Sequence, residues 1–336
     1  MSPATRKWIE IALTAAGALL LVHLVRRVGF DVLWTDIANF GPWFLVTGAV
    51  AGGWLWLQAA AWWLVQTRVC PDARLLPLWR AKIISDGLNF VLPSAGVGGD
   101  AMRPFLAQAH VPLSQGIPAV VVDKTIEFAA SVVFLAPVLL LGLLTIPLPK
   151  AIAVAAVISL VTTAIGIGLL IAALRNGMTG LLLGAARLVP GVRGAIARRQ
   201  QWLATMDGNF VRLRAAGARA TLVPLALHVL ARIAGALEVL VAMAVLGTPV
   251  TLVQALFICA VVTVGNTVFF LLPGQWGVAE SVHVVVVQSL GYPPAIGLSL
   301  AVLRRLRRLL FVALALALYA ASGRQPAPAA EAHAIH

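Results

Sequence analysis

Residues 86–103 read Asp-Gly-Leu-Asn-Phe-Val-Leu-Pro-Ser-Ala-Gly-Val-Gly-Gly-Asp-Ala-Met-Arg, a proline and glycine break inside an apolar stretch. Proline ends a helix, and glycine admits turns and close approaches that other residues cannot make. Non-helical backbone at membrane depth is tolerated only inside protein or beside a water-filled cavity. The stretch predicts a broken hairpin whose second helix begins near Gly99, capped by Ser94 or Asp100, with its positive end facing a polar cavity. A cytoplasmic loop between two helices is the alternative.

The whole chain has the composition of a polytopic membrane protein. Its 336 residues are 61% hydrophobic and 11% charged, and its mean hydropathy is +0.96. Soluble proteins carry about 25% charged residues, so this composition excludes a cytosolic enzyme, a secreted disulfide scaffold and a disordered regulator. The formal net charge of +13 resides mainly in loops and segment ends, which indicates orientation by the positive-inside rule and attraction to anionic lipid. No nucleic-acid partner and no cofactor or metal site is predicted.

The predicted fold is all-α, with about six transmembrane helices and two broken or re-entrant hairpins. The apolar windows are 8–25, 43–66, 116–146, 151–174, 221–246 and 294–321, and the segments 75–92 and 251–272 each precede a break. The arginine-rich loop 175–220 is predicted to be cytoplasmic, which places the N-terminus inside and the loop 27–42 outside. That basic loop either lies along the inner leaflet or is solvated, and residues 325–336 form a disordered tail.

An internal two-fold repeat is the second organising feature. An offset of 180 residues aligns Pro93 with Pro273 and then brings rare polar residues into register. The aligned pairs are Asp100 with Glu280, Lys124 with Arg304, Asp86 with Asn266, Arg103 with His283 and Gln58 with Glu238. The repeats are residues 1–148, with a broken hairpin at about 75–112, and residues 149–324, with a broken hairpin at about 251–290. Re-entrant hairpins would make the repeats inverted, which is favoured, and spanning ones would make them parallel.

Charged residues inside the apolar windows predict a binding site, because a membrane helix keeps such residues only where they face a partner or a polar cavity. Asp123, Lys124 and Glu127 lie within one turn of the third window, and Arg304, Arg305, Arg307 and Arg308 lie deep in the last. The arginines are expected either to pair with acids and bind phosphate or to reach an interface by snorkelling. His228 and Arg232 share a helix face, Glu238 lies elsewhere, and structural pairing is expected for these three.

These motifs give the chain a family resemblance. The patterns Asn89-x3-Pro93-x2-Gly96-x-Gly98-Gly99-Asp100-x2-Arg103, Asp123-Lys124-x2-Glu127 and Pro273-Gly274-x2-Gly277-x2-Glu280 resemble those of the lysylphosphatidylglycerol synthase membrane-region family, a group of flippase-like integral membrane proteins. The resemblance covers roughly residues 8–322 and extends to stand-alone members found beside hopanoid biosynthesis. It implies a membrane fold with a lipid head-group cavity. Because the chain ends at His336 without an aminoacyl-transferase domain, we expect no transferase activity.

The combined prediction is a lipid flippase or transporter in a bacterial inner membrane, with possible lipid-biosynthesis or envelope-transport partners. A membrane-embedded lipid-modifying enzyme and a scaffold for an envelope complex are the alternatives. The predicted head-group residues are Asn89, Pro93, Ser94, Gly96, Gly98, Gly99, Asp100, Arg103, Lys124, Pro273, Gly277, Glu280, Arg304, Arg305 and Arg308. The predicted charge-pairing or proton-coupling residues are Asp123, Glu127, His228, Arg232, Glu238 and Arg307. We expect the polar groups of the two halves, Asp100, Lys124, Glu280 and Arg304 among them, to converge on one shared pocket.

Overall fold

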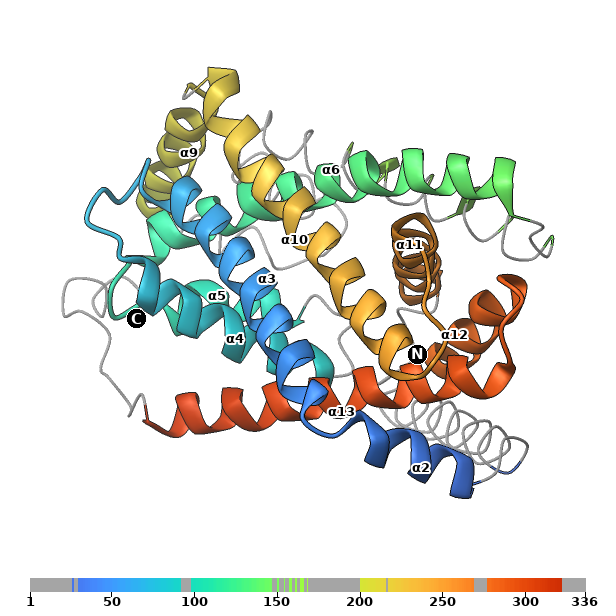
Figure 1. The fold of residues 1–336 in the computed structure, drawn as a ribbon. Coiled ribbons are helices and arrows are strands. Elements are labelled where there is room, and N and C mark those ends of the chain that lie inside the picture. The colour runs from blue at the N-terminus through green and yellow to red at the C-terminus, as the bar shows by residue number, and fades with distance from the viewer. Residues whose placement is uncertain are drawn as a thin grey trace, which may run out of the picture.

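The computed structural model describes residues 26, 30–91, 98–146, 150, 200–215, 217–268 and 277–321, with isolated positions between 154 and 168. The secondary structure of these residues is helical, as the apolar periodicity predicts (Figure 1). The helices are α2 (Phe30–Phe40), α3 (Trp43–Gln66), α4 (Leu75–Val91), α5 (Gly98–Leu106), α6 (Leu113–Thr145), α9 (Gln200–Ala215), α10 (Gly217–Val245), α11 (Leu252–Val268), α12 (Val278–Ser289) and α13 (Pro294–Ala321).

Three of the described helices contain a segment long and apolar enough to cross a bilayer. These segments are Trp43–Gln66, Leu113–Gly142 and Ala220–Val245, and each falls on a predicted crossing. The helix α13 covers the predicted crossing 294–321, but its central arginines make it more polar than the others. The predicted crossing 8–25, most of 151–174, the first part of the basic loop and the tail 325–336 lie outside the described residues.

Two predicted loops contain helices. Residues 27–42 were expected to be an outside loop by counting back from the basic loop 175–220, yet α2 forms there. Phe40 is buried in the core. The basic loop 175–220 ends in α9, where Asn209 donates a hydrogen bond of 2.9 Å to the carbonyl of Ser114 at the start of α6.

The helix order repeats with the predicted offset. Adding 180 to Gly98, where α5 begins, gives 278, the first residue of α12; adding 180 to Leu113, where α6 begins, gives 293, one residue before α13 begins. In the same way α3 corresponds to α10 and α4 to α11 within a few residues. Figure 1 shows that α3 and α10 lie side by side at the centre and run in opposite directions, and that α6 and α13, at the top and bottom of the view, also run in opposite directions.

The first helix of each hairpin lies in the interior, against the last long helix of the other half. Phe257 and Ile258 of α11 are fully buried, and a Cβ atom added to Gly142 of α6 would lie 2.2 Å from the Phe257 ring. In the other half, a Cβ atom on Gly87 of α4 would lie 2.6 Å from Cβ of Ala315 on α13. Glycine therefore permits the close approach at both contacts, and these contacts hold the two halves together.

The arms of the first hairpin also meet at a glycine. A Cβ atom added to Gly99 would lie 2.1 Å from the carbonyl oxygen of Ser85 and 2.7 Å from Oδ1 of Asn89. Oδ1 of Asn89 instead accepts a hydrogen bond of 2.8 Å from the Gly99 amide. Because Gly99, the second residue of α5, has no side chain, the start of α5 can pack directly against α4.

Replacing Gly99 with alanine is expected to force α4 and α5 apart and to lower stability by about 1–3 kcal/mol or more. Gly52→Ala is the control, because nothing lies within 4 Å of a Cβ at Gly52 in α3; there alanine should be neutral or stabilising by about 0.5–1 kcal/mol. The midpoint of thermal unfolding in detergent measures both. Equal midpoints for the two variants would contradict the close contact.

Candidate functional site

The buried charges form two clusters rather than the single shared pocket that the sequence led us to expect. Asp100 and Lys124 belong to a first cluster, which joins α4, α5, α6 and α10, whereas Glu280 and Arg304 belong to a second, which joins α10, α11, α12 and α13. Among the described residues, no ion pair joins the two clusters. The described ion pairs thus divide the predicted residues between two clusters, and each hairpin acid, Asp100 or Glu280, pairs with bases of its own half.

Asp100 is the centre of the first cluster. It is 4% exposed, and its Oδ2 lies 2.6 Å from Nζ of Lys124. Arg103 pairs with Asp100 one turn along α5, and Nζ of Lys82 lies 4.0 Å away. Lys124 also contacts Glu127 at 3.0 Å, which is the i,i+3 pair expected from the sequence.

Asp123 connects the first half of the chain to α10. Its Oδ2 accepts a 2.9 Å hydrogen bond from Nη1 of Arg103, and its Oδ1 lies 2.9 Å from Nε2 of His228. One turn further along α10, Arg232 donates to Oγ of Ser131 on α6. His228 and Arg232 therefore share a face, as predicted, and that face packs on α6.

The first cluster is balanced in charge. It contains the bases Lys82, Arg103, Lys124 and Arg232 and the acids Asp86, Asp100, Asp123 and Glu127. These eight side chains sum to four positive and four negative charges. Every one of these carboxylates has a cationic partner, which is the condition under which buried charges are tolerated. These contacts indicate that the first cluster has a structural role and holds α4, α5, α6 and α10 together.

Arg103→Gln is expected to destabilise the protein by about 3–5 kcal/mol, because it leaves Asp100 and Asp123 buried with a partner missing. Arg80→Gln is the matched control, since Arg80 lies on the exposed side of α4 and its loss should change stability by less than about 0.5 kcal/mol. Unfolding followed by tryptophan fluorescence in detergent compares them. A small, equal loss in both variants would show that Arg103 is not structural.

The tip of the first hairpin is only partly described. Pro93, Ser94 and Gly96 lie outside the described residues, as does Pro273 in the second hairpin. Asp100 does not cap α5, because its carboxylate is held by Lys124 and Arg103. Asn89, from the other arm, caps it instead. Asparagine favours this role, but its distance along the chain concealed the pairing from sequence reasoning.

The second cluster is arranged around two glutamates. Glu238 of α10 is 2% exposed; its Oε2 lies 3.1 Å from Nε of Arg304, and its Oε1 lies 2.6 Å from Nε of Arg307. Glu280 of α12 pairs with Arg305 at 2.7 Å. The guanidinium of Arg307 also lies 4.5 Å from the centre of the Trp54 ring, a contact that the sequence did not reveal. Glu238 thus lies apart from His228 and Arg232, as predicted.

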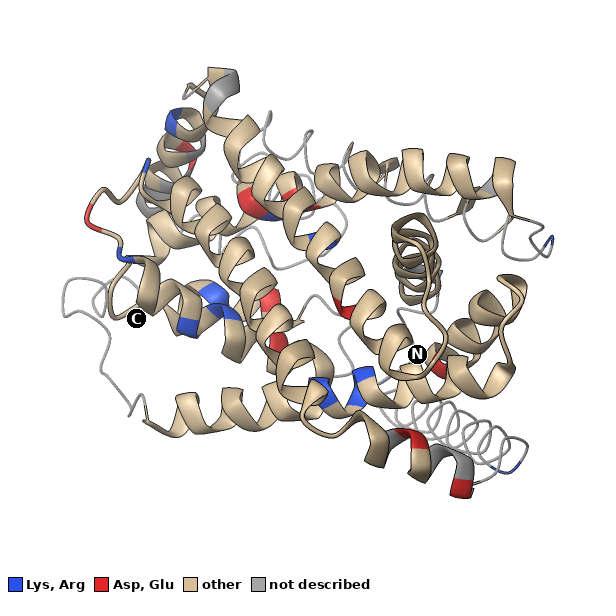
Figure 2. Ribbon diagram, in the orientation of Figure 1, with Lys and Arg blue, Asp and Glu red and all other residues tan. Residues whose placement is uncertain are grey.

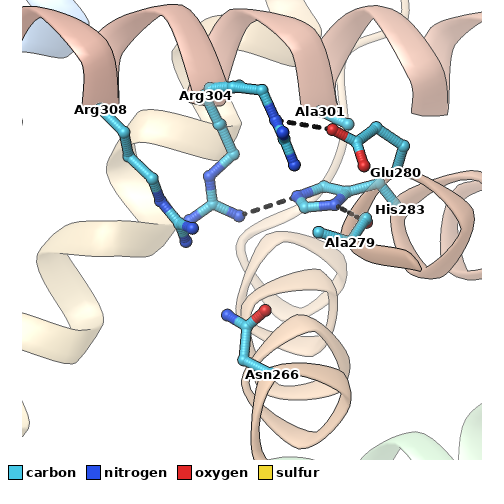
Figure 3. Close-up of a pocket in the computed structure, with 8 residues that line it drawn as sticks. Asn266, Ala279, Glu280, His283, Ala301, Arg304 and Arg308 are labelled. Carbon is cyan, nitrogen blue, oxygen red and sulfur yellow. Dashed lines mark hydrogen bonds and ion pairs between the residues drawn. The ribbon is translucent and has the colours of Figure 1, made fainter. Parts of the chain in front are cut away.

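A small pocket adjoins these arginines (Figure 3). It is lined by Asn266, Ala279, Glu280, His283, Ala301, Arg304, Arg305 and Arg308. Its free volume of about 20 Å³ is room for roughly one water molecule or one phosphate oxygen. The helix α12 that supplies Glu280 follows Gly277, whose φ of 74° favours glycine.

His283 is neutral in this arrangement. Its Nδ1 lies 2.7 Å from the carbonyl oxygen of Ala279, so this nitrogen carries the proton and donates. Its Nε2 lies 3.3 Å from Nη1 of Arg304 and therefore accepts. His283 and Asn266 were not among the predicted site residues; their repeat register with Arg103 and Asp86 was the signal that could have found them.

The second cluster is not balanced in charge. Four arginines, 304, 305, 307 and 308, face two glutamates, 238 and 280. Among the described residues, no carboxylate forms an ion pair with Arg308, which lines the pocket beside Arg304. Figure 2 shows that the basic positions of α13 lie in its middle turns, away from both ends. The surplus of two positive charges lies at the pocket.

A comparison with known proteins agrees with the fold. The family described as "Lysylphosphatidylglycerol synthase TM region" matches residues 7–315, most of the chain. The chain belongs to this family of multi-pass membrane proteins, which is associated with the modification or flipping of membrane lipids. No curated protein matches the chain. No solved structure matches it either.

Proposed function

We propose that the protein is a lipid transporter that moves an amphipathic lipid between leaflets. The observation that carries this proposal is the surplus of two positive charges at a pocket beside the middle of α13. Uncompensated charge in an apolar environment is strongly unfavourable, and an anionic head group would remove it. The acyl or isoprenoid tail would stay in the bilayer, so only the head group needs polar contacts.

The relation between the two halves supports alternating access. Equivalent helices run in opposite directions, with α3 against α10 and α6 opposite α13 (Figure 1), as in the inverted repeats of many secondary transporters. Each hairpin packs on the long helix of the other half through a glycine contact. Rocking of one half against the other would expose the pocket to each leaflet in turn.

The two clusters have different roles in this proposal. Arg304, Arg305 and Arg308, with Glu280 at the start of α12, would receive the head group. Asp100, Arg103, Lys124 and Asn89, predicted as head-group residues, are better explained as structural, since their contacts are made with one another and with neighbouring acids. The pair of Asp123 and His228 crosses from one half to the other and is the candidate for proton coupling.

Translocation by purified protein in liposomes separates transport from the two alternatives. A fluorescent anionic phospholipid is placed in one leaflet, and the fraction that becomes accessible to an added quencher is followed with time. Redistribution of unchanged lipid supports transport, a new lipid product supports an enzyme, and the absence of both would favour a scaffold.

We place the protein in a bacterial inner membrane with a cytoplasmic N-terminus, which reporter fusions at each end would test.

Arg304→Ala is expected to reduce translocation by at least about tenfold without loss of folded protein. Glu238 keeps Arg307 at 2.6 Å in this variant, so no carboxylate loses its last partner. Lys124→Ala provides the contrast, because it removes a partner of Asp100 and Glu127 and should lower folded yield first. If the Arg304→Ala protein is well folded and translocates lipid at the normal rate, the proposed role of the pocket is contradicted.

A further inference from the structure

The duplication shows where the surplus charge arose. Adding 180 to Glu127 gives Arg307, and adding 180 to Phe128 gives Arg308. Positions that carry an acid and an aromatic ring in the first half therefore carry two bases in the second. The same offset replaces Asp123 with Leu303. The first site is neutral by composition, whereas the second lacks the acids that would neutralise it.

The geometry of the pocket concentrates this charge. Arg304 and Arg308 are four residues apart on α13 and so lie on one helix face, and both line the pocket (Figure 3). Among the described pocket residues, Arg304 donates a hydrogen bond to the neutral imidazole of His283 alone, and its carboxylate partner Glu238 is not part of the pocket lining. Two guanidinium groups that face the same small space repel each other unless an anion lies between them.

We infer that this pocket binds a doubly charged phosphate, the terminal monoester or diphosphate of a lipid, rather than a singly charged phosphodiester. This inference rests on the proposed function and specifies its substrate. Among the residues that the structure describes, four arginines against two glutamates with a neutral His283 leave a charge of +2. A dianion neutralises this charge, a phosphodiester neutralises half of it, and a zwitterionic head group neutralises none. The pocket accepts one phosphate oxygen, and guanidinium groups bind phosphate oxygens in pairs.

Native mass spectrometry of the full chain tests the inference directly. Delipidated protein at pH 8 is mixed with equal amounts of dioleoyl phosphatidic acid, dioleoyl phosphatidylglycerol and dioleoyl phosphatidylcholine. We expect phosphatidic acid to be retained about tenfold more than phosphatidylglycerol, since one further charge-assisted contact contributes about that factor. Equal retention of the monoester and the diester by the unaltered protein would overturn the inference.

Arg308→Gln is expected to bring the monoester-to-diester ratio close to one, and Arg308→Lys should retain the preference because the charge remains. Loss of Arg308 leaves no described carboxylate without its base, so the variant should fold. Arg80→Gln, outside the pocket, is the control and should keep the ratio. An unchanged ratio in Arg308→Gln would assign the preference to another part of the protein.

Asn266→Asp offers an independent variant, because it adds a negative charge to the pocket lining and should also reduce the preference for the monoester. Inorganic phosphate at the same concentration as the lipid distinguishes a lipid from a free anion. Failure of phosphate to displace the lipid supports a lipid substrate, and complete displacement would overturn that part. If the protein binds the monoester selectively but does not move lipid between leaflets, only the transport proposal is contradicted. If it moves lipid but does not distinguish the monoester from the diester, only the inference about the charge of the head group is contradicted.

Discussion

Buried carboxylates paired with bases from neighbouring helices organise this structure. A bilayer offers no water to solvate Asp100, Arg103 or Asp123, so each is held by an ion pair in the interior. The partners come from separate helices, α5 and α6, with His228 added from α10. A buried carboxylate without a cationic partner is strongly unfavourable. These ion pairs therefore fix the positions of the helices relative to one another. The hairpin is thus positioned by electrostatics as much as by packing.

Close helix approach is the second constraint, and glycine makes it possible. The interior helices α4 and α11 have little room, since each is enclosed by helices of both halves. Gly87 and Gly142 occur where a hairpin helix meets the long helix of the opposite half, and Gly99 occurs where two arms of one hairpin meet. Loss of these contacts would expose apolar surface between halves. The same contacts are where relative motion of the halves would have to occur.

Much of this was predictable from sequence, and the failures have physical causes. Apolar windows predicted α3, α6 and α10, because a span of about 20 apolar residues is a strong signal. The starts of α5 at Gly98 and of α12 at Val278 differ by the same 180 residues that align Pro93 with Pro273. The α2 helix was missed because residues 27–42 were assigned as the connection between two predicted crossings. Contacts between residues distant in the sequence could not be predicted. Neither the ion-pair partner of Arg304 nor the capping of α5 by Asn89 can be read from sequence spacing, because each depends on which helices lie side by side.

Duplication creates two copies of a polar site, and the two copies need not keep the same role. In the first, acids on the hairpin and on the long helix neutralise every base, which suits a rigid element that must hold its shape. In the second, Arg307 and Arg308 replace Glu127 and Phe128, and among the described residues the carboxylates Glu238 and Glu280 compensate only half of the positive charge. Such a surplus is unfavourable in an apolar environment, and the proposed anionic head group would remove it. The asymmetry between the two sites therefore points to the ligand more directly than either site does alone.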